Sequence, residues 1–276
     1  MTVTAESRTV ELDPRRNVPG TRPGFSSTLR AEWIKFWSVR STTWSTVMLF
    51  VLGAGLTALI CAASAGWLAS SDADESPLSF VTWGMMFAQI TAVVLGALVV
   101  TAEYGTGMIR ATLAATPRRG SGRAAKALVL AGTLFVVGTA TAFVGYLAGN
   151  WFLDREGIGV ALSDEGVARA LVGSGLYLAG LGLFAMAVGL LVRHTAAALS
   201  VVLALVFVVG NMAFLLPGTW GDWVAKLLPG NAGGVVTQAV PFEGQLLSPW
   251  NGFAVFAAEV LALLTIGYLV FQRRDA

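Results

Sequence analysis

Six apolar runs, separated by polar or glycine-rich connections, dominate the pattern along the chain. A helix needs about 20 residues to cross a hydrocarbon core of roughly 30 Å, and each run is at least that long. None of the runs alternates between apolar and polar residues with period two, which favours helices over barrel strands. The predicted spans are residues 44–66, 79–102, 127–152, 168–192, 195–216 and 250–271. The sequence therefore predicts an all-α integral membrane protein with six transmembrane helices.

The N-terminal part divides into a polar tail and an amphipathic stretch. Residues 1–25 contain three prolines and no long apolar run, so we expect a disordered tail before a single six-helix domain over residues 26–276. The stretch 29–44 predicts a helix lying at the membrane surface, although it could also be the fringe of the first span. In that helix Glu32 and Lys35 point away from the apolar side. The side chains on the apolar side are Leu29, Trp33, Phe36 and Trp37.

The connections between the spans differ in length and character. Little more than Arg193 and His194 joins the fourth span to the fifth, which predicts a tight hairpin. The segment 217–249 is long, contains four prolines and still carries apolar patches. We expect it to form short helices that rest in, or dip into, the outer leaflet of the membrane, since irregular backbone is tolerated there when protein or water satisfies it. The alternative is a loosely folded external loop.

Composition and charge support a membrane protein and orient it. Of the 276 residues, 55% are hydrophobic and only 12% are charged, against about 25% charged in soluble domains. With six spans, both termini lie on one side of the membrane. That side carries fifteen of the eighteen basic residues, and the other side has only Arg155, Arg169 and Lys226. Lysine and arginine accumulate in cytoplasmic loops, so both termini are predicted to be cytoplasmic.

The polar loop over residues 101–126 holds the densest positive charge in the chain. Five basic residues accompany one acid, Glu103. The sequence Gly105-Thr106-Gly107 predicts a turn with Thr106 as an N-cap, after which residues 108–115 can form two turns of helix that Pro117 ends. The loop is thus predicted to present a short cytoplasmic helix between the second and third spans.

The run EYGTGMIRATLAATPRR in this loop resembles the first cytoplasmic loop of bacterial ABC-2 type permeases, the membrane-spanning subunits of ABC exporters. The stretch 29–44 and the closing FQRRDA resemble the N-terminal interfacial helix and the cytoplasmic end of that family. The resemblance implies a coupling helix that docks on a separate ABC ATPase subunit. Glu103 and Arg110 would fix the loop geometry, and Arg118 and Arg119 would contact lipid headgroups or the ATPase. The residues to which it assigns this coupling are Glu103, Tyr104, Gly105, Thr106, Gly107, Met108, Arg110, Leu113, Pro117, Arg118 and Arg119.

The resemblance also implies an assembly and a location. Two permeases, as a homodimer or as a heterodimer with a related chain, would work with two ATPase subunits in the bacterial inner membrane. ATP and Mg²⁺ would bind to the partner ATPase, because this chain has no G-x-x-x-x-G-K-[ST] motif and we expect no cofactor of its own. We expect no enzymatic activity, metal site or nucleic-acid partner. The single histidine, His194, belongs to no zinc-binding motif and is interpreted as a residue of an interfacial loop.

Polar residues within the spans are candidates for a translocation path. Gln89 and Asn211 could line it, although a hydrogen bond to a neighbouring helix is the simpler explanation of each. Glu259 lies nine residues into the sixth span, where a carboxylate is costly and usually faces a cavity or a partner. It therefore suggests a second reading, a proton-coupled secondary transporter, although the two halves of the chain show no convincing repeat. A third reading is a membrane scaffold or immunity protein that transports nothing.

Overall fold

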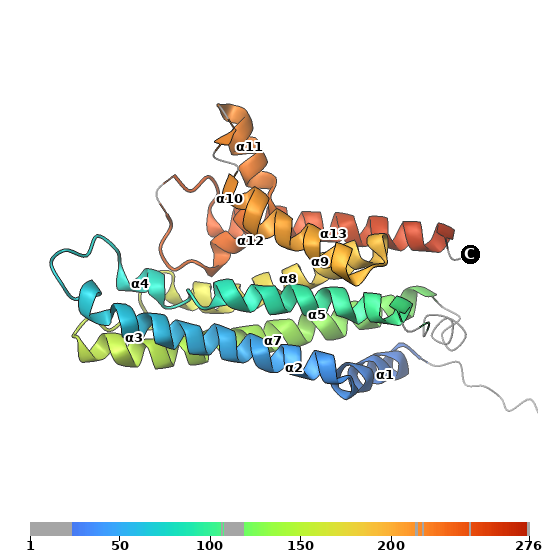
Figure 1. The fold of residues 1–276 in the computed structure, drawn as a ribbon, viewed down its shortest axis with the longest axis horizontal. Coiled ribbons are helices and arrows are strands. Elements are labelled where there is room, and N and C mark those ends of the chain that lie inside the picture. Colours follow the sequence, from blue (N-terminus) through green and yellow to red (C-terminus); the bar gives the residue numbers. More distant parts are fainter. Residues whose placement is uncertain are drawn as a thin grey trace, which may run out of the picture.

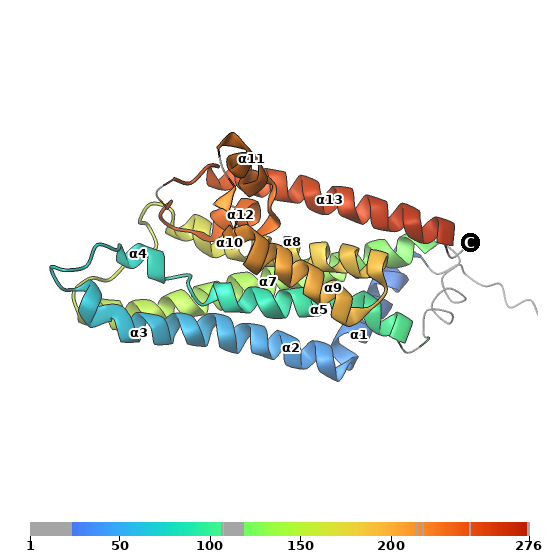
Figure 2. The ribbon, with the colours of Figure 1, turned by 45° about the horizontal axis from the view of Figure 1, so that its top comes forward.

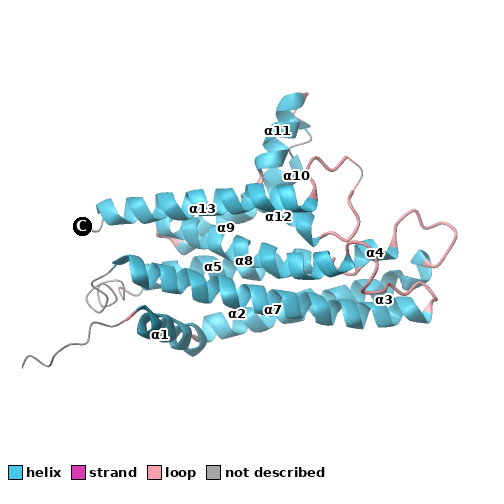
Figure 3. Cartoon of the chain, turned by 180° about the vertical axis from the view of Figure 1, so that it is seen from behind, coloured by secondary structure: helices cyan, strands magenta, loops and turns pink. Residues whose placement is uncertain are grey.

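The computed structural model describes residues 24–105, 107, 119–212, 215–216, 218–242 and 244–274. Within these ranges the chain is helical and contains no β-strand (Figure 3). Six helical segments are long and apolar enough to cross a membrane, and they run roughly along one axis (Figure 1). The predicted all-α chain with six such helices is confirmed. A chain of this kind is a multi-pass membrane protein, since helices satisfy their backbone groups in lipid without outside partners.

The first three spans lie between Arg40 and Arg155. The first is continuous through α2 (Arg40–Phe50), the π-helix η1 (Val51–Gly55) and α3 (Leu56–Leu68). The second comprises the short helix α4 (Pro77–Phe80), a turn and α5 (Met85–Gly105), and the third is α7 (Arg119–Arg155). The start of α4 follows from its sequence. Pro77 fits the first helical position, and Ser76 Oγ accepts a hydrogen bond of 3.3 Å from the Leu78 amide.

The last three spans are α8, a composite fifth segment and α13. Helix α8 (Val167–Val192) is followed by α9 (Thr195–Leu203), the π-helix η2 (Ala204–Val209) and α10 (Gly210–Met212). The fifth span is described as helix as far as Met212, and its predicted end at residue 216 borders residues outside the described ranges. Next come α11 (Thr219–Leu227), α12 (Pro229–Gly234) and the 3₁₀-helix η4 (Val235–Thr237), and α13 (Pro249–Arg274) closes the chain. The predicted short helices between the fifth and sixth spans are therefore present. Helix α11 projects sideways from the bundle (Figure 1) and lies beside α12 and the start of α13 (Figure 2).

Helix α8 is the most buried span and lies against α5, α7 and α13. Two hydrophobic clusters meet on it, one shared with the first three spans and one shared with α9, η2, α12 and α13. Small residues permit the close approach. A Cβ atom placed on Gly96 of α5 would lie 2.1 Å from the carbonyl oxygen of Gly182 in α8. Backbones in membrane helices approach this closely only where side chains are small.

Helix α1 (Phe25–Ser38) lies at the same end of the bundle as the C-terminal end of α13 (Figure 1). We call this the α1 end, and the opposite end, where α3 finishes and α4 lies, the α4 end. Val39 is extended and separates α1 from α2, so the helix predicted over 29–44 is broken there. Phe36 is buried and Leu29 packs partly against the core, whereas Trp33 and Trp37 are exposed.

Candidate functional site

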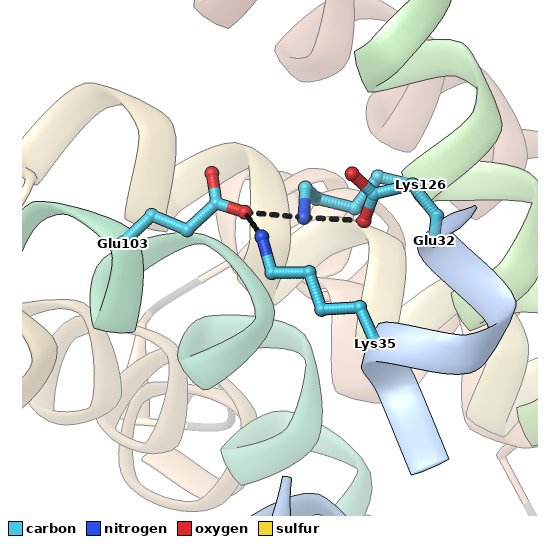
Figure 4. A network of polar contacts seen from close by, with 4 residues as sticks. All are labelled: Glu32, Lys35, Glu103 and Lys126. Atoms are coloured by element: carbon cyan, nitrogen blue, oxygen red, sulfur yellow. Dashed lines mark hydrogen bonds and ion pairs between the residues drawn. The ribbon is translucent and has the colours of Figure 1, made fainter. Parts of the chain in front are cut away.

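Four charged side chains from three helices meet at the α1 end of the bundle, at the base of the segment that connects α5 to α7. Helix α5 ends at Gly105 and α7 begins at Arg119. The residues are Glu32 and Lys35 of α1, Glu103 of α5 and Lys126 of α7, and we call them the ion cluster (Figure 4). Glu32 and Lys35 are three positions apart on α1, which places them on the same face of that helix.

The two lysines bridge the helices. Lys126 Nζ lies 2.7 Å from Glu32 Oε2 and 2.7 Å from Glu103 Oε1, so one ammonium joins α7 to both α1 and α5. Lys35 donates to the same oxygen of Glu103. The cluster contains two acids and two bases, and its charges balance.

Burial makes this arrangement interdependent. The side chains of Glu103 and Lys126 are each 8% exposed, that of Glu32 is 12% exposed and that of Lys35 is 29% exposed. A buried charge left without its partner costs several kcal/mol, whereas a complete network is tolerated. Each member therefore holds the others in place, and α1 is fixed to both helices that flank the connecting segment.

Further contacts hold the base of the segment. The guanidinium of Arg193, in the α8–α9 connection, lies 5.3 Å from the ring centre of Tyr104 on α5. Thr195 Oγ1 donates to Thr101 Oγ1 over 2.8 Å. On the other flank, the guanidinium of Arg123 lies 5.4 Å from the ring centre of Tyr268 on α13. Cations within about 6 Å of an aromatic ring centre are attracted to it. Helices from both halves of the chain therefore converge on this segment.

A cavity of about 160 Å³ adjoins the ion cluster. All four charged residues line it, and its remaining wall is largely apolar, with Phe36, Val39, Leu98 and Val99 among the lining residues.

The residues that the sequence singled out for ATPase coupling fall into two groups. The described ones are Glu103, Tyr104, Gly105, Gly107 and the backbone of Arg119. Gly107 has a positive φ of 70°, which suits the predicted turn. Arg119 begins α7, eight residues before the predicted start of the third span. Thr106, Met108, Arg110, Leu113, Pro117 and Arg118 lie outside the described residues.

The sequence missed three members of the ion cluster, because Lys126 was counted only among the basic residues of the loop and Glu32 and Lys35 were assigned to a surface helix. Glu32 and Lys35 were expected only to point away from the apolar side of a surface helix, but in the structure Lys35 bonds to α5 and Glu32 bonds to α7. A signal was present, because Glu103 is an isolated acid in a basic loop and an acid beside a span needs a cation. The sequence does not show which cation pairs with Glu103, because this depends on how α1 packs against the bundle.

The structure brings together two of the three candidates for a translocation path and leaves the third apart. Gln89 and Asn211 line one cavity of about 410 Å³ towards the α4 end, between the second, fourth and fifth spans and the α12–η4 segment. There the Tyr177 hydroxyl donates to Gln89 Oε1 over 2.9 Å. Glu259 lines neither this cavity nor the one beside the ion cluster. Its Oε2 atom is buried and has no hydrogen-bond partner within the described part of the chain.

His194 has a local structural role. Its Nδ1 atom accepts a hydrogen bond of 3.4 Å from the Ala197 amide and so caps α9. In the ranges that the structure covers, no three His, Cys, Asp or Glu side chains are grouped as a metal site requires.

The sequence matches no protein-family model, and no curated protein matches it.

Proposed function

We propose that this chain is the permease subunit of an ATP-driven exporter of the ABC-2 type. The observation that carries the proposal is the ion cluster. It ties both flanks of the segment 106–118 to α1, and this segment is the one whose sequence resembles a coupling loop. A partner that pushes on the segment would therefore move α1, α5 and α7 together rather than bend a loose connection.

The energy of ATP binding would reach the spans through the ion cluster and the contacts beside it. ATP binding would close two ATPase subunits, and the short helix predicted over 108–115 would follow that movement. The Lys126 bridge would pass the displacement to α1 and α7, and the Tyr104 and Tyr268 contacts would pass it to the second half of the chain. The ATPase, ATP and Mg²⁺ belong to the partner, and a second permease would complete the path.

The distribution of charge supports the orientation that this function needs. The α1 end would be cytoplasmic, because fifteen of the eighteen basic residues lie on that side of the spans. The coupling segment would then face the compartment that holds ATP. The membrane would be the inner membrane of a bacterium, as the resemblance implies.

A proton-coupled carrier is less well supported. Glu259 is the acid that such a mechanism would use, yet it lies on α13, the least buried of the six spans, and lines neither cavity described above. A relay needs a path of water or titratable groups, and the ion cluster has no evident purpose in that mechanism.

Two loop variants test the proposal. Arg110→Glu reverses a charge on the predicted coupling helix, and Leu113→Asp places a charge where an apolar contact with the ATPase is expected. We expect both to keep normal membrane levels, since neither lies in a predicted span. Each should lose association with the ATPase, measured by co-purification at matched expression, and transport should be lost with it.

The control is Arg155→Glu, which makes the same charge reversal at an exposed position on the α4 end of the bundle. It should leave co-purification intact. Retention of the ATPase and of full transport in both loop variants would remove the coupling role from this segment.

A further inference from the structure

The 410 Å³ cavity towards the α4 end is built from four parts of the chain that are distant in sequence. Residues of α4 and α5, of α8, of the η2–α10 region and of the α12–η4 segment all line it. Its volume is in the range of pockets that bind small molecules. One wall includes Val206 and Phe207 of the π-helix η2, and π-helical turns in spans occur frequently at functional sites.

Hydrogen bonds hold these walls together around the cavity. Thr82 Oγ1 donates to the Thr237 carbonyl over 3.0 Å and ties the turn after α4 to η4. Asn231 Nδ2 donates to the Gly210 carbonyl over 3.2 Å and ties α12 to α10. The cavity is therefore framed by cross-links between segments and is not a gap between loosely placed helices.

The lining combines uncharged polar groups with aromatic and aliphatic ones. Gln89 and Tyr177 form a buried hydrogen-bonded pair in it. Gln238 Oε1 is buried and accepts no hydrogen bond within the described part of the chain. A buried acceptor without a partner costs free energy that a ligand hydroxyl or amide could recover. Trp83 and Phe207 supply apolar surface to the same space.

None of the described lining residues has a charged side chain. Arg169 binds to the backbone of the cavity wall but does not line the cavity. Its Nη2 atom donates to the Gln238 carbonyl over 2.9 Å and to the Ala239 carbonyl over 3.1 Å. The guanidinium thus stabilises the wall by way of the backbone. A charged ligand would lose its hydration here without gaining a counter-charge, which is costly.

We infer that this cavity binds an uncharged amphiphile, a small molecule with hydroxyl or amide groups at one end and an apolar remainder. The polar end would pair with Gln238 and with the Gln89 amide, and the apolar part would lie against Trp83 and Phe207. That this ligand is the exported substrate rests on the proposed function, whereas its binding does not.

Gly234 offers a way to fill the cavity selectively. It lines the cavity, has an ordinary helical φ of −67°, and a Cβ atom placed on it meets nothing within 4 Å. A side chain at this position therefore enters open space without straining the backbone. Gly132 of α7 is the matched control, since its Cβ direction is equally open but it is exposed on the outside of the bundle.

The experiment is photo-crosslinking of the purified permease in lipid nanodiscs, without any ATPase. The probe is decanoylglycerol with a diazirine in its chain, and decanoate and decylamine with the same diazirine serve as charged counterparts. We expect the neutral probe to label peptides that line the cavity about tenfold more than either charged probe. Gly234→Phe should lose most of this labelling, and Gly132→Phe should keep it.

Gln238→Leu provides an independent variant, because it removes the unpaired acceptor without filling the space. It should reduce labelling by about fivefold, which is the loss of affinity expected when one hydrogen bond is removed. Equal labelling by all three probes, or labelling that neither Gly234→Phe nor Gln238→Leu reduces, would overturn the inference. Selective labelling in a protein that never associates with an ATPase would refute the export proposal and leave the binding site standing.

Discussion

Lys126 is the residue on which the ion cluster depends most, because its ammonium contacts carboxylates from two different helices. Lys126→Met would leave two mostly buried acids with Lys35 as the only cation in the cluster. Removal of one partner from a buried ion pair costs about 3–5 kcal/mol. We expect a large fall in the temperature at which the purified protein loses its monodisperse form, measured by gel filtration after heating.

A second variant separates this charge effect from lost packing. Glu32→Gln combined with Lys126→Met removes one acid and one base and leaves the Lys35–Glu103 pair balanced. The double variant should therefore lose less stability than the two single variants added together. Strict additivity would show that the cluster members act independently. Arg155→Met, at an exposed position, is the control and should change little.

At the level of single residues, the sequence showed which residues were unusual but not which residues they contact. Glu103 stood out as the one acid in a basic loop, and Gln89 and Asn211 stood out as polar residues in spans. The partners of Glu103 and Gln89 lie on other helices: Lys126 is on α7, and Tyr177 is on α8, 88 residues from Gln89. The periodicity of α1 does not show which of its faces packs against the bundle, because residues of both its apolar and its polar face contact neighbouring helices.

Among the helices, α5 and α8 approach each other closely because the residues at their contact, Gly96 and Gly182, are small. Gly96→Leu would place a branched side chain where even a Cβ atom lies 2.1 Å from a carbonyl oxygen of α8. The two spans would have to separate, so we expect little monodisperse protein to be recovered from the membrane. Gly66→Leu on α3 is the control, since its Cβ direction is open and the residue is exposed. Equal recovery of the two variants would contradict this packing.

The helices themselves were largely predictable, because twenty apolar residues in a row leave the backbone few alternatives in a membrane. Their ends and irregularities were not. Helix α7 extends to Arg119 because the polar residues 119–126 are held by contacts to α1 and α13, which hydropathy does not register. The π-helices η1 and η2 also left no signal in an apolar sequence, since every residue around them is equally compatible with an α-helix.

For the whole molecule, the main prediction concerns orientation. In a Cys61→Ala background, single cysteines at Asp74 and Glu165, both exposed on the α4 side, should react with a membrane-impermeant maleimide added to intact cells. A cysteine at Gly105, which is exposed at the end of α5 and has an open Cβ direction, should react only after permeabilisation. Labelling of Gly105→Cys in intact cells would reverse the topology and place the coupling segment outside.

The balanced and mostly buried charges of the ion cluster also govern how the protein responds to ionic strength. Mobile ions screen exposed charges beyond about 10 Å at 0.1 M salt but hardly reach pairs in direct contact inside a protein. Concentrated salt should thus weaken contacts that exposed arginines make with a peripheral partner and leave the joint between α1, α5 and α7 closed. A salt wash of isolated membranes would then strip such a partner from a permease that is still folded and ready to bind it again.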